Sequence, residues 1–333
     1  MMVAAAAPVG TTIKVRVEET WLTAGDVRVF RLRSDDALPG FTAGAHVNVQ
    51  VRTHDGRDDW RRYSLVNLDP TPCATDSPAD YLLAVRLDPA SRGGSHHMHH
   101  AVQTGDTLVI EPPRNDFAHA AHKARSVLIA GGIGITPMAS MAAHGRAIGQ
   151  VLTLHYAGRS RASMAWLPEL QTLLGDDLRV HADDEQGGPL GVADILAGCQ
   201  LQDHVYVCGP QPMLDAVLRH TAQLGWGSER VHFELFSAPQ GEAADKAFDV
   251  ELAGSGRRLH VPADRTLLDV LNEAGYDVLF DCERGECGVC MVPVVSGDID
   301  HRDYVLTENE KKKGQVMHPC VSRCKGPLLV LKL

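Results

Sequence analysis

The chain has 333 residues, enough for two or three domains, and 44% of them are hydrophobic, which is sufficient for sizeable cores. Its formal net charge of −10 argues against a nucleic-acid partner, because phosphate binding needs a basic face. No apolar run approaches the ~20 residues that cross a bilayer, and the uncharged start lacks the basic segment of a signal peptide, so we expect a cytoplasmic protein with no membrane partner.

Residues 10–118 are predicted to form an antiparallel β-barrel. Five segments alternate apolar and polar residues, or run β-branched, between turns of Gly, Pro and Asp: 12–21, 27–34, 46–53, 80–89 and 106–113. Several short strands at this spacing are typical of a barrel.

Residues 119–238 change to an alternation of apolar strands and helical patterns. That alternation predicts an α/β domain, with a parallel sheet covered by helices on both faces. Residues 239–247 are small and polar and are interpreted as a linker. Residues 248–333 are expected to form a third domain, which opens with a hairpin-like pair and a helix.

Four of the eight cysteines gather near the end of the chain. Cys282, Cys287 and Cys290 have the spacing C-x4-C-x2-C, and Cys320 follows after residues 291–319. This is the plant-type [2Fe–2S] pattern, in which each iron takes two thiolates. Glycines inside the loop let the backbone approach the cluster and donate N–H groups to sulfur.

A structural zinc site is the alternative. Cys324 would then join Cys320 as the second ligand pair, but their x3 spacing differs from the CxxC pairs that zinc favours. We therefore expect iron and treat Cys324 as a spare thiol packed near the cluster. Cys324 lies outside the C-x4-C-x2-C…C pattern, as do the scattered Cys73, Cys199 and Cys208.

Several features together resemble the phthalate dioxygenase reductase family, part of the ferredoxin–NADP reductase superfamily. They are "WRRYSLVN", "GGIGITPM", "CGPQPM" and the C-terminal ferredoxin pattern, and the match covers nearly the whole chain. The family feeds Rieske-type ring-hydroxylating oxygenases and aromatic O-demethylases. The resemblance implies an FMN-binding β-barrel, an α/β nicotinamide domain and a β-grasp-like plant-type ferredoxin domain of α+β class.

In "WRRYSLVN" the resemblance gives each side chain a role toward the flavin. Tyr63 would stack on the ring, and Ser64 would hydrogen-bond near N5, where hydride arrives. Arg61 would pair with the flavin phosphate, for which a guanidinium fork is suited.

"SRGGSHHMHHAV" is implied to hold the FMN phosphate. Gly93, Gly94 and Ser95 can cap a helix whose first N–H groups bind an anion. His96 and His100 lie one helical turn apart, which leaves a metal reading open. We expect instead that these histidines line the first turn of the helix, with one of them facing the phosphate.

"AGGIGITP" forms a glycine turn between a strand and a helix. The turn contains Gly131, Gly132 and Gly134, but it lacks the third glycine of the G-x-G-x-x-G motif. It is not a P-loop either, because no G-K-[ST] follows. The resemblance implies that this turn receives the NAD pyrophosphate, with Thr136 near the nicotinamide.

"VCGPQPM" places Cys208, Gly209 and Pro210 at the carboxyl end of a strand, where ligands of open α/β sheets bind. The resemblance implies that Cys208 faces the nicotinamide. Glu234 and Phe236 resemble the end segment that covers the flavin ring.

The choice of nucleotide depends on the loop after "VLTLHYAG". Arg159 and Arg161 flank a serine there, and the loop has no carboxylate to accept from the 2′-OH of NADH. The family favours NADH. We therefore expect NADH first, with measurable use of NADPH.

Together these features predict a monomeric, NADH-dependent reductase. Hydride would pass to FMN, and single electrons would pass through the [2Fe–2S] cluster to a terminal oxygenase, a Rieske non-haem iron aromatic oxygenase or O-demethylase. Two alternatives stay open. One is a reductase for a cytochrome P450. The other is a stand-alone flavin oxidoreductase with a zinc- or cluster-bearing sensor or binding domain.

Overall fold

The structure is a computed structural model that describes residues 11–70, 78–91, 93–120, 122–239 and 244–333. It divides into two compact units, one ending at Glu234 and the other beginning at Leu235. Cys73 lies outside the described residues. Within the described ranges, no helix is both long and apolar enough to cross a membrane.

The first sheet of the first unit is an antiparallel barrel. Its strands are β1 (Ile13–Ala24), β2 (Val27–Arg33), β3 (His46–Arg52), β4 (Asp58–Ser64), β5 (Tyr81–Arg86) and β6 (Thr107–Ile110), in the order β4-β3-β6-β1-β2-β5. The N–H of Val66 donates to the carbonyl of Leu82 at 2.8 Å, so the edge strands meet. Alternate residues such as Val17, Val49 and Leu83 fill the interior. The predicted barrel is confirmed, and the short helix α1 (Gly94–His100) follows β5.

The second sheet is parallel throughout. Its strands are β7 (Ser126–Gly131), β8 (Leu152–Gly158), β9 (Leu178–Ala182), β10 (His204–Cys208) and β11 (Val231–Glu234), in the order β11-β10-β7-β8-β9. The order reverses between β7 and β10, which creates the crevice where open α/β sheets bind ligands.

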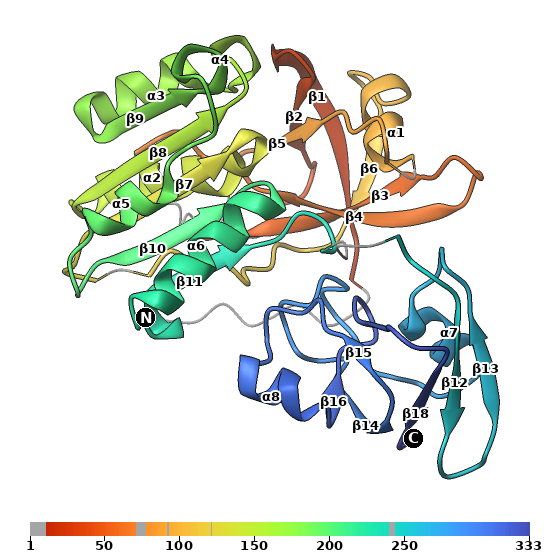
Figure 1. Ribbon diagram of the computed structural model, residues 1–333. Coiled ribbons are helices and arrows are strands. Elements are labelled where there is room, and N and C mark those ends of the chain that lie inside the picture. The colour runs from red at the N-terminus through yellow and green to blue at the C-terminus, as the bar shows by residue number, and fades with distance from the viewer. Residues whose placement is uncertain (1–10, 71–77, 92, 121, 240–243) are drawn as a thin grey trace. The chain divides into compact units, whose positions relative to one another are not determined.

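Helices cover both faces of this parallel sheet, as the alternating pattern predicted. They are α2 (Ile135–Ala147), α3 (Leu167–Leu174), α4 (Asp183–Gln186), α5 (Val192–Ala197) and α6 (Gln211–Gln223), with the 3-10 turn η1 (Gly132–Gly134) before α2. α5 and α6 pack together on one face, and α2 with α3 lies on the other (Figure 1).

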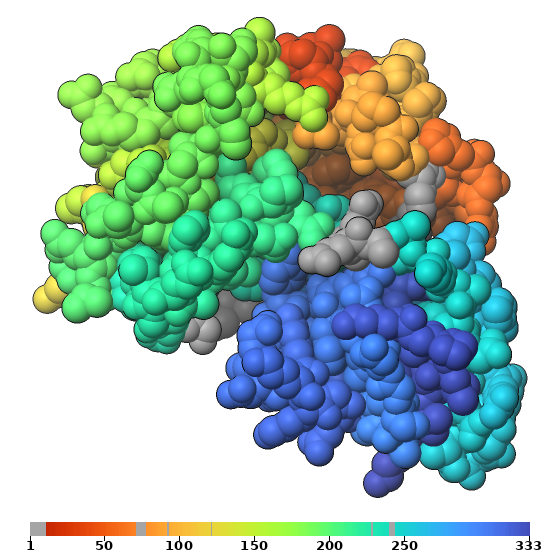
Figure 2. Space-filling model, viewed as in Figure 1, coloured from red at the N-terminus to blue at the C-terminus, as the bar shows by residue number. Residues whose placement is uncertain are grey.

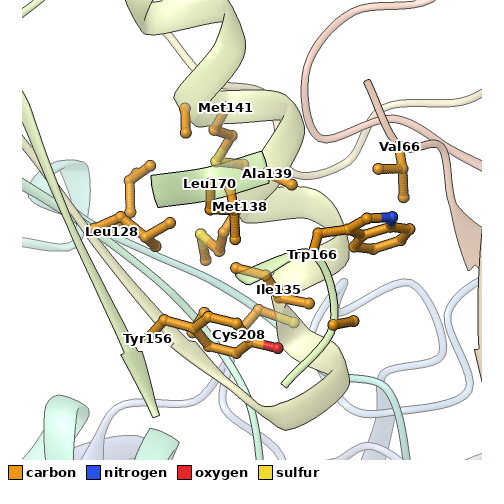
Figure 3. Packing of buried hydrophobic residues seen from close by; sticks show 14 of the residues in the cluster. Val66, Leu128, Ile135, Met138, Ala139, Met141, Tyr156, Trp166, Leu170 and Cys208 are labelled. Carbon is orange, nitrogen blue, oxygen red and sulfur yellow. The ribbon is translucent and has the colours of Figure 1, made fainter. Parts of the chain in front are cut away.

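One buried cluster joins the barrel to the parallel sheet. Val29, Val66 and Ala84 of the barrel share it with Met138 of α2 and with Trp166. Figure 3 shows Val66 beside Trp166, which begins α3. Because interiors of this kind are close-packed, the shared core fixes the two sheets relative to each other.

The second unit is a mixed sheet with one main helix. The strands β12 (Phe248–Leu252), β13 (Arg258–Val261), β14 (Val292–Ser296), β16 (Val316–Met317) and β18 (Leu328–Leu331) lie in the order β13-β12-β18-β14-β16, while β15 (Ile299–Asp300) pairs with β17 (Arg323–Cys324). α7 (Leu267–Glu273) buries Leu267 and Leu271 against the sheet. The Thr307 hydroxyl caps α8 (Glu308–Lys313). This is the expected α+β ferredoxin architecture.

The segment expected as a linker is partly attached to the second unit. Asp245 pairs with Arg302 at 2.5 Å, and Arg323 donates to the carbonyl of Lys246 at 3.1 Å. Residues 240–243 of that segment lie outside the described residues.

Candidate functional site

The end of β4 presents a buried hydroxyl with nothing to bind. Ser64 is 4% exposed, and its Oγ finds no hydrogen-bond partner among the described residues. Buried polar groups are normally satisfied, so an orphan here fits a ligand atom supplied from outside the chain. Tyr63 precedes it, and burial raises the pKa of the phenol above its usual value, so the ring stays neutral.

Arg61 lies against the start of α1. A Cβ atom built on Gly94 would come within 2.9 Å of the Arg61 Nε, so only glycine leaves room for this contact. Gly93 has φ 114°, and a Cβ there would approach the backbone of His54 at 2.5 Å. Arg61 binds Asp59 at 2.5 Å, yet its Nη2 is buried with no partner in the part of the chain described. A guanidinium with a spare donor beside glycine N–H groups fits a phosphate.

Two polar side chains of α1 already have hydrogen-bond partners. The Ser95 hydroxyl accepts from the N–H of Asp88 at 3.1 Å, and its place at the start of α1, as a cap for the expected phosphate site, stays a prediction. His99 is buried and bonds to the carbonyl of Val85 at 2.8 Å. The rings of His96 and His100 lie 4.4 Å apart, on the turn predicted from their spacing.

The glycine turn and the cysteine strand end meet at the reversal point of the parallel sheet. A Cβ on Gly134 would lie 2.1 Å from the Cys208 carbonyl oxygen, and one on Gly131 would lie 2.6 Å from Pro210 Cδ. A Cβ on Gly209 would lie 3.1 Å from Gly131 Cα. These glycines are therefore required for the close approach of two loops that were predicted to form one nucleotide site.

Thr136 and Glu234 border the same strand ends. Thr136 is 2% exposed and donates to the carbonyl of Ile133 at 3.0 Å, so its hydroxyl holds the turn. Glu234 is 3% exposed and lies directly opposite Cys208 in the β10–β11 register. Phe236, expected at the flavin, is 39% exposed and belongs to the second unit.

The surface of the first unit is hollowed between the orange barrel and the green parallel-sheet domain (Figure 2). The end of β4 and the Cys208 loop belong to these two domains, whose packing is fixed by the shared core. The shared core therefore fixes the end of β4 and the Cys208 loop relative to each other.

Sequence reasoning missed a carboxylate beside the two arginines. The Nε of Arg161 donates to both oxygens of Glu185 in α4, at 2.8 and 3.1 Å. The N–H of Asp184 donates to the carbonyl of Arg159 at 3.2 Å, which brings α4 to the end of β8. The loop itself contains no carboxylate, as noted, but the helix α4 supplies one.

Four of the five cysteines of the second unit form two sulfur pairs. The Sγ atoms of Cys290 and Cys320 are 3.3 Å apart, and the thiol of Cys282 neighbours that of Cys287. Hydrogen bonding with Cys320 lowers the pKa of Cys290 to about 6, while the pKa of Cys320 is raised. Across the described ranges, no three His, Cys, Asp or Glu side chains converge on a single ion. Two separate pairs suit two irons better than one tetrahedral zinc.

The loop around these sulfurs depends on glycine. Gly285 and Gly288 have φ values of 74° and 77°, and a Cβ on Gly285 would lie 2.8 Å from Val321. The N–H of Arg284 donates to the Cys282 sulfur at 3.3 Å. The thiol of Cys324 donates to the carbonyl of Leu328 at 3.5 Å.

Two protein-family profiles match the chain. The 2Fe-2S iron-sulfur cluster binding domain matches residues 250–325, which include all four paired cysteines. The oxidoreductase NAD-binding domain matches residues 128–219, which include the glycine turn and Cys208.

Several known proteins align with almost the whole of this chain. A putative toluene-4-sulfonate monooxygenase system reductase subunit of Comamonas testosteroni is 39% identical over 96% of this chain and 99% of its own length. The structure of phthalate dioxygenase reductase, a modular structure for electron transfer from pyridine nucleotides to [2Fe–2S], is 35% identical with a TM-score of 0.72, over 97% of this chain and 98% of that one. An intact type IV self-sufficient cytochrome P450 monooxygenase is 36% identical over 99% of this chain, with a TM-score of 0.68, but this chain spans only 43% of it.

Proposed function

The chain belongs to the phthalate dioxygenase reductase family of NAD(P)H-to-[2Fe–2S] oxygenase reductases, and we propose that it carries electrons from NADH through FMN and the cluster to a separate Rieske-type terminal oxygenase acting on an aromatic compound. The observation that carries the proposal is the pairing of two polar sites in one unit. An unsatisfied Ser64 hydroxyl lies on the barrel, and the glycine–cysteine crevice lies on the parallel sheet that shares its core.

The barrel residues hold the flavin in this proposal. The Arg61 guanidinium and the N–H groups at Gly93 and Gly94 bind a terminal phosphate, which favours FMN as the flavin. Tyr63 offers a flat apolar face on which the flavin ring stacks, and the Ser64 hydroxyl donates a hydrogen bond toward the edge of that ring. A bound flavin supplies the conversion of a two-electron donor to one-electron delivery.

The residues of the parallel sheet position the nucleotide. The N–H groups of the turn at Gly131, Gly132 and Gly134 receive the pyrophosphate at the start of α2. Cys208 is small and 1% exposed, so it borders the nicotinamide pocket without filling it. The buried carboxylate of Glu234, opposite Cys208, is a second polar group that can orient the carboxamide.

In the second unit, Cys282 and Cys287 would bind one iron, and Cys290 and Cys320 the other. Thiolate ligands must be deprotonated, so binding of the cluster would release the thiol protons of these cysteines. The N–H of Arg284 points at the Cys282 sulfur and would stabilise added negative charge there.

A cytochrome P450 is the second candidate acceptor. The observation that favours it is that almost the whole chain aligns with a segment of a self-sufficient P450 monooxygenase, where donor and acceptor lie in one polypeptide. Identifying the oxygenase gene beside this one, and measuring NADH-dependent reduction of its purified product, separates the two acceptors.

Cofactor content and acceptor reduction test the proposal together. We expect a red-brown protein with one FMN and two irons per chain, which reduces cytochrome c with NADH. One zinc and no iron would indicate the zinc-stabilised flavin oxidoreductase. A full cluster with negligible cytochrome c reduction would indicate a sensor or binding module.

A further inference from the structure

A buried carboxylate lies behind the cysteine loop. Asp303 is 2% exposed, and its Oδ2 accepts from the N–H of Leu306 at 2.8 Å. Its Oδ1 lies 3.5 Å from the Ser322 hydroxyl and 3.5 Å from the Nδ1 of His318. The Nδ1 of His301 is 3.7 Å away. A buried carboxylate of this kind is unusual unless it has a role, because burying charge is costly.

Its backbone is packed directly on the loop that carries the cysteines. The N–H of Tyr304, the next residue, donates to the Gly285 carbonyl at 2.9 Å. A Cβ on Gly285 would lie 3.1 Å from the Asp303 Cα. Gly285 in turn makes a backbone hydrogen bond to the Cys320 sulfur. Only Gly285 therefore separates Asp303 from one sulfur of the second pair.

The nearest side-chain partners of this carboxylate are His318, His301 and Ser322, and the neighbouring Lys and Arg side chains bind other groups. Lys311 Nζ donates to the backbone carbonyl of Asp303 at 2.8 Å, not to its side chain. The guanidinium of Arg302 is directed to Asp300 and Asp245, at 2.7 and 2.5 Å. Because the Asp303 side chain has no exposed surface, solvent and salt screen its charge poorly.

We propose that the Asp303 carboxylate sets the reduction potential of the cluster and acts as a positioning residue for the Gly285 turn. This rests on the proposed function, because it assumes that the four cysteines hold a [2Fe–2S] cluster. Reduction adds one electron to the cluster, and a fixed negative charge behind the loop opposes that addition. The carboxylate therefore keeps the potential low and the reduced cluster a strong donor.

Asp303→Asn tests the charge with little change of shape. Asparagine keeps an oxygen that accepts from Leu306, so the turn is retained. At a fixed solution potential we expect the ratio of reduced to oxidised cluster to rise about tenfold, an upward shift of ~59 mV for one electron. The potential is measured by redox titration of the visible absorption and of the reduced-cluster EPR signal.

Two further variants separate charge from structure. Asp298→Asn removes the same charge from a side chain that is 73% exposed in the same unit, and it should leave the potential unchanged. Ser322→Ala removes the hydroxyl facing Asp303 Oδ1 and leaves the charge less compensated, so the ratio should fall about twofold. If Asp303→Asn does not fold, the lower ratio of reduced to oxidised cluster expected for Ser322→Ala still tests the proposal.

The outcomes distinguish this inference from the function on which it rests. A parent protein without iron overturns both. A parent with a full cluster, together with an Asp303→Asn variant whose potential is unchanged or lower, overturns only the role of Asp303. Equal shifts in Asp303→Asn and Asp298→Asn would also overturn it, since net charge alone would explain them.

Discussion

The hydroxyl of Ser140 in α2 donates a 2.8 Å hydrogen bond to the backbone carbonyl of Leu65, directly after β4. The same oxygen accepts from the N–H of Asn67 at 2.8 Å. One buried side chain therefore connects the helix that begins at the nucleotide turn to the strand end that carries Tyr63 and Ser64. The distance from nicotinamide to flavin depends on this connection in our proposal, and positioning of reacting groups is a large part of catalysis.

Ser140→Ala should weaken that connection. The Leu65 carbonyl and the Asn67 N–H would lose their partner, at about 1–3 kcal/mol for a buried unsatisfied group. We expect a lower melting temperature, by roughly 2–4 °C per kcal/mol, and slower flavin reduction by NADH. Thr172→Ala, which removes an exposed hydroxyl of α3, is the control. Equal melting temperatures for Ser140→Ala and the parent would contradict the role of this bond.

Ser64→Ala should slow hydride transfer far more than it weakens flavin binding. One hydrogen bond to the flavin edge contributes about 0.5–1.5 kcal/mol to binding. Its loss matters more where negative charge develops during the reaction, and we expect about a hundredfold slower reduction in stopped-flow experiments. The Thr172→Ala protein should react at the parent rate. An unchanged rate in Ser64→Ala would remove this residue from the site.

Much of this architecture was predictable because it depends on local sequence patterns. The strand alternation in the barrel, the glycine turn at Gly131 and the cysteine spacing each lie within a few tens of residues. The missed contacts join distant segments. Ser140 meets Leu65 across 75 positions, and Glu185 reaches Arg161 from α4, the helix that follows β9. No local period encodes such pairs, so only the folded chain brings them together.

The hydrogen-bond partners of the polar side chains at the site were harder still to predict. Ser95 was expected to cap the helix at the phosphate site, and no feature of the sequence indicated that its hydroxyl also accepts from the N–H of Asp88. No sequence motif marks Asp303, because its proposed role depends on its burial behind Gly285. Burial and hydrogen-bond satisfaction are properties of packing, and a single sequence reports them only weakly.

Cys290→Ala should remove the cluster and spare the flavin. Losing one of four thiolates leaves one iron with a single ligand, so we expect iron content and the visible cluster absorption to fall toward zero. Flavin reduction by NADH should persist, because its residues lie in the other unit. Cys324→Ala is the matched control, since that thiol faces the Leu328 carbonyl. Loss of flavin reduction in Cys290→Ala would contradict the separation of the two sites.

Acid should destabilise the first unit through buried histidine. Burial, aided by neighbouring His144, lowers the pKa of His119 from 6.5 to about 3. The unfolded chain therefore binds this proton more readily, so the stability is complete above about pH 6.5 and is lost as the pH falls toward 3. At pH 5 the loss from His119 alone is about 2 kcal/mol.

His119→Gln should reduce that loss, because the variant no longer excludes a proton at this position. Thermal unfolding at pH 7 and pH 5, followed by flavin fluorescence, measures the difference. The exposed His260, replaced in the same way, serves as control. A parent whose first unit melts equally at both pH values would show that His119 is not buried as a neutral group.

The preference for NADH should depend on the pair formed by Arg161 and Glu185. Arg161 lies directly after β8 and Glu185 lies in α4, which follows β9. In open α/β nucleotide domains the end of the second strand faces the adenosine ribose. Glu185 accepts both bonds from the Arg161 Nε, and it is a carboxylate that can bind the 2′-OH of NADH. Its charge also repels the 2′-phosphate of NADPH. We therefore expect NADH to be preferred, with NADPH still used at a measurable rate.

Glu185→Gln should release Arg161 toward the 2′-phosphate. A charge-assisted bond contributes about 1.5–3 kcal/mol, so kcat/KM for NADPH relative to NADH should rise roughly ten- to a hundredfold. Both side chains are about half exposed, so the lost ion pair itself should hardly change stability. Arg161→Ala should lower the NADPH ratio, Arg159→Ala tests the neighbouring guanidinium, and the helix α3 variant Glu169→Gln is the charge-matched control. If the parent discriminates by more than a thousandfold, or if the ratio stays constant across all three site variants, this loop does not read the 2′ position.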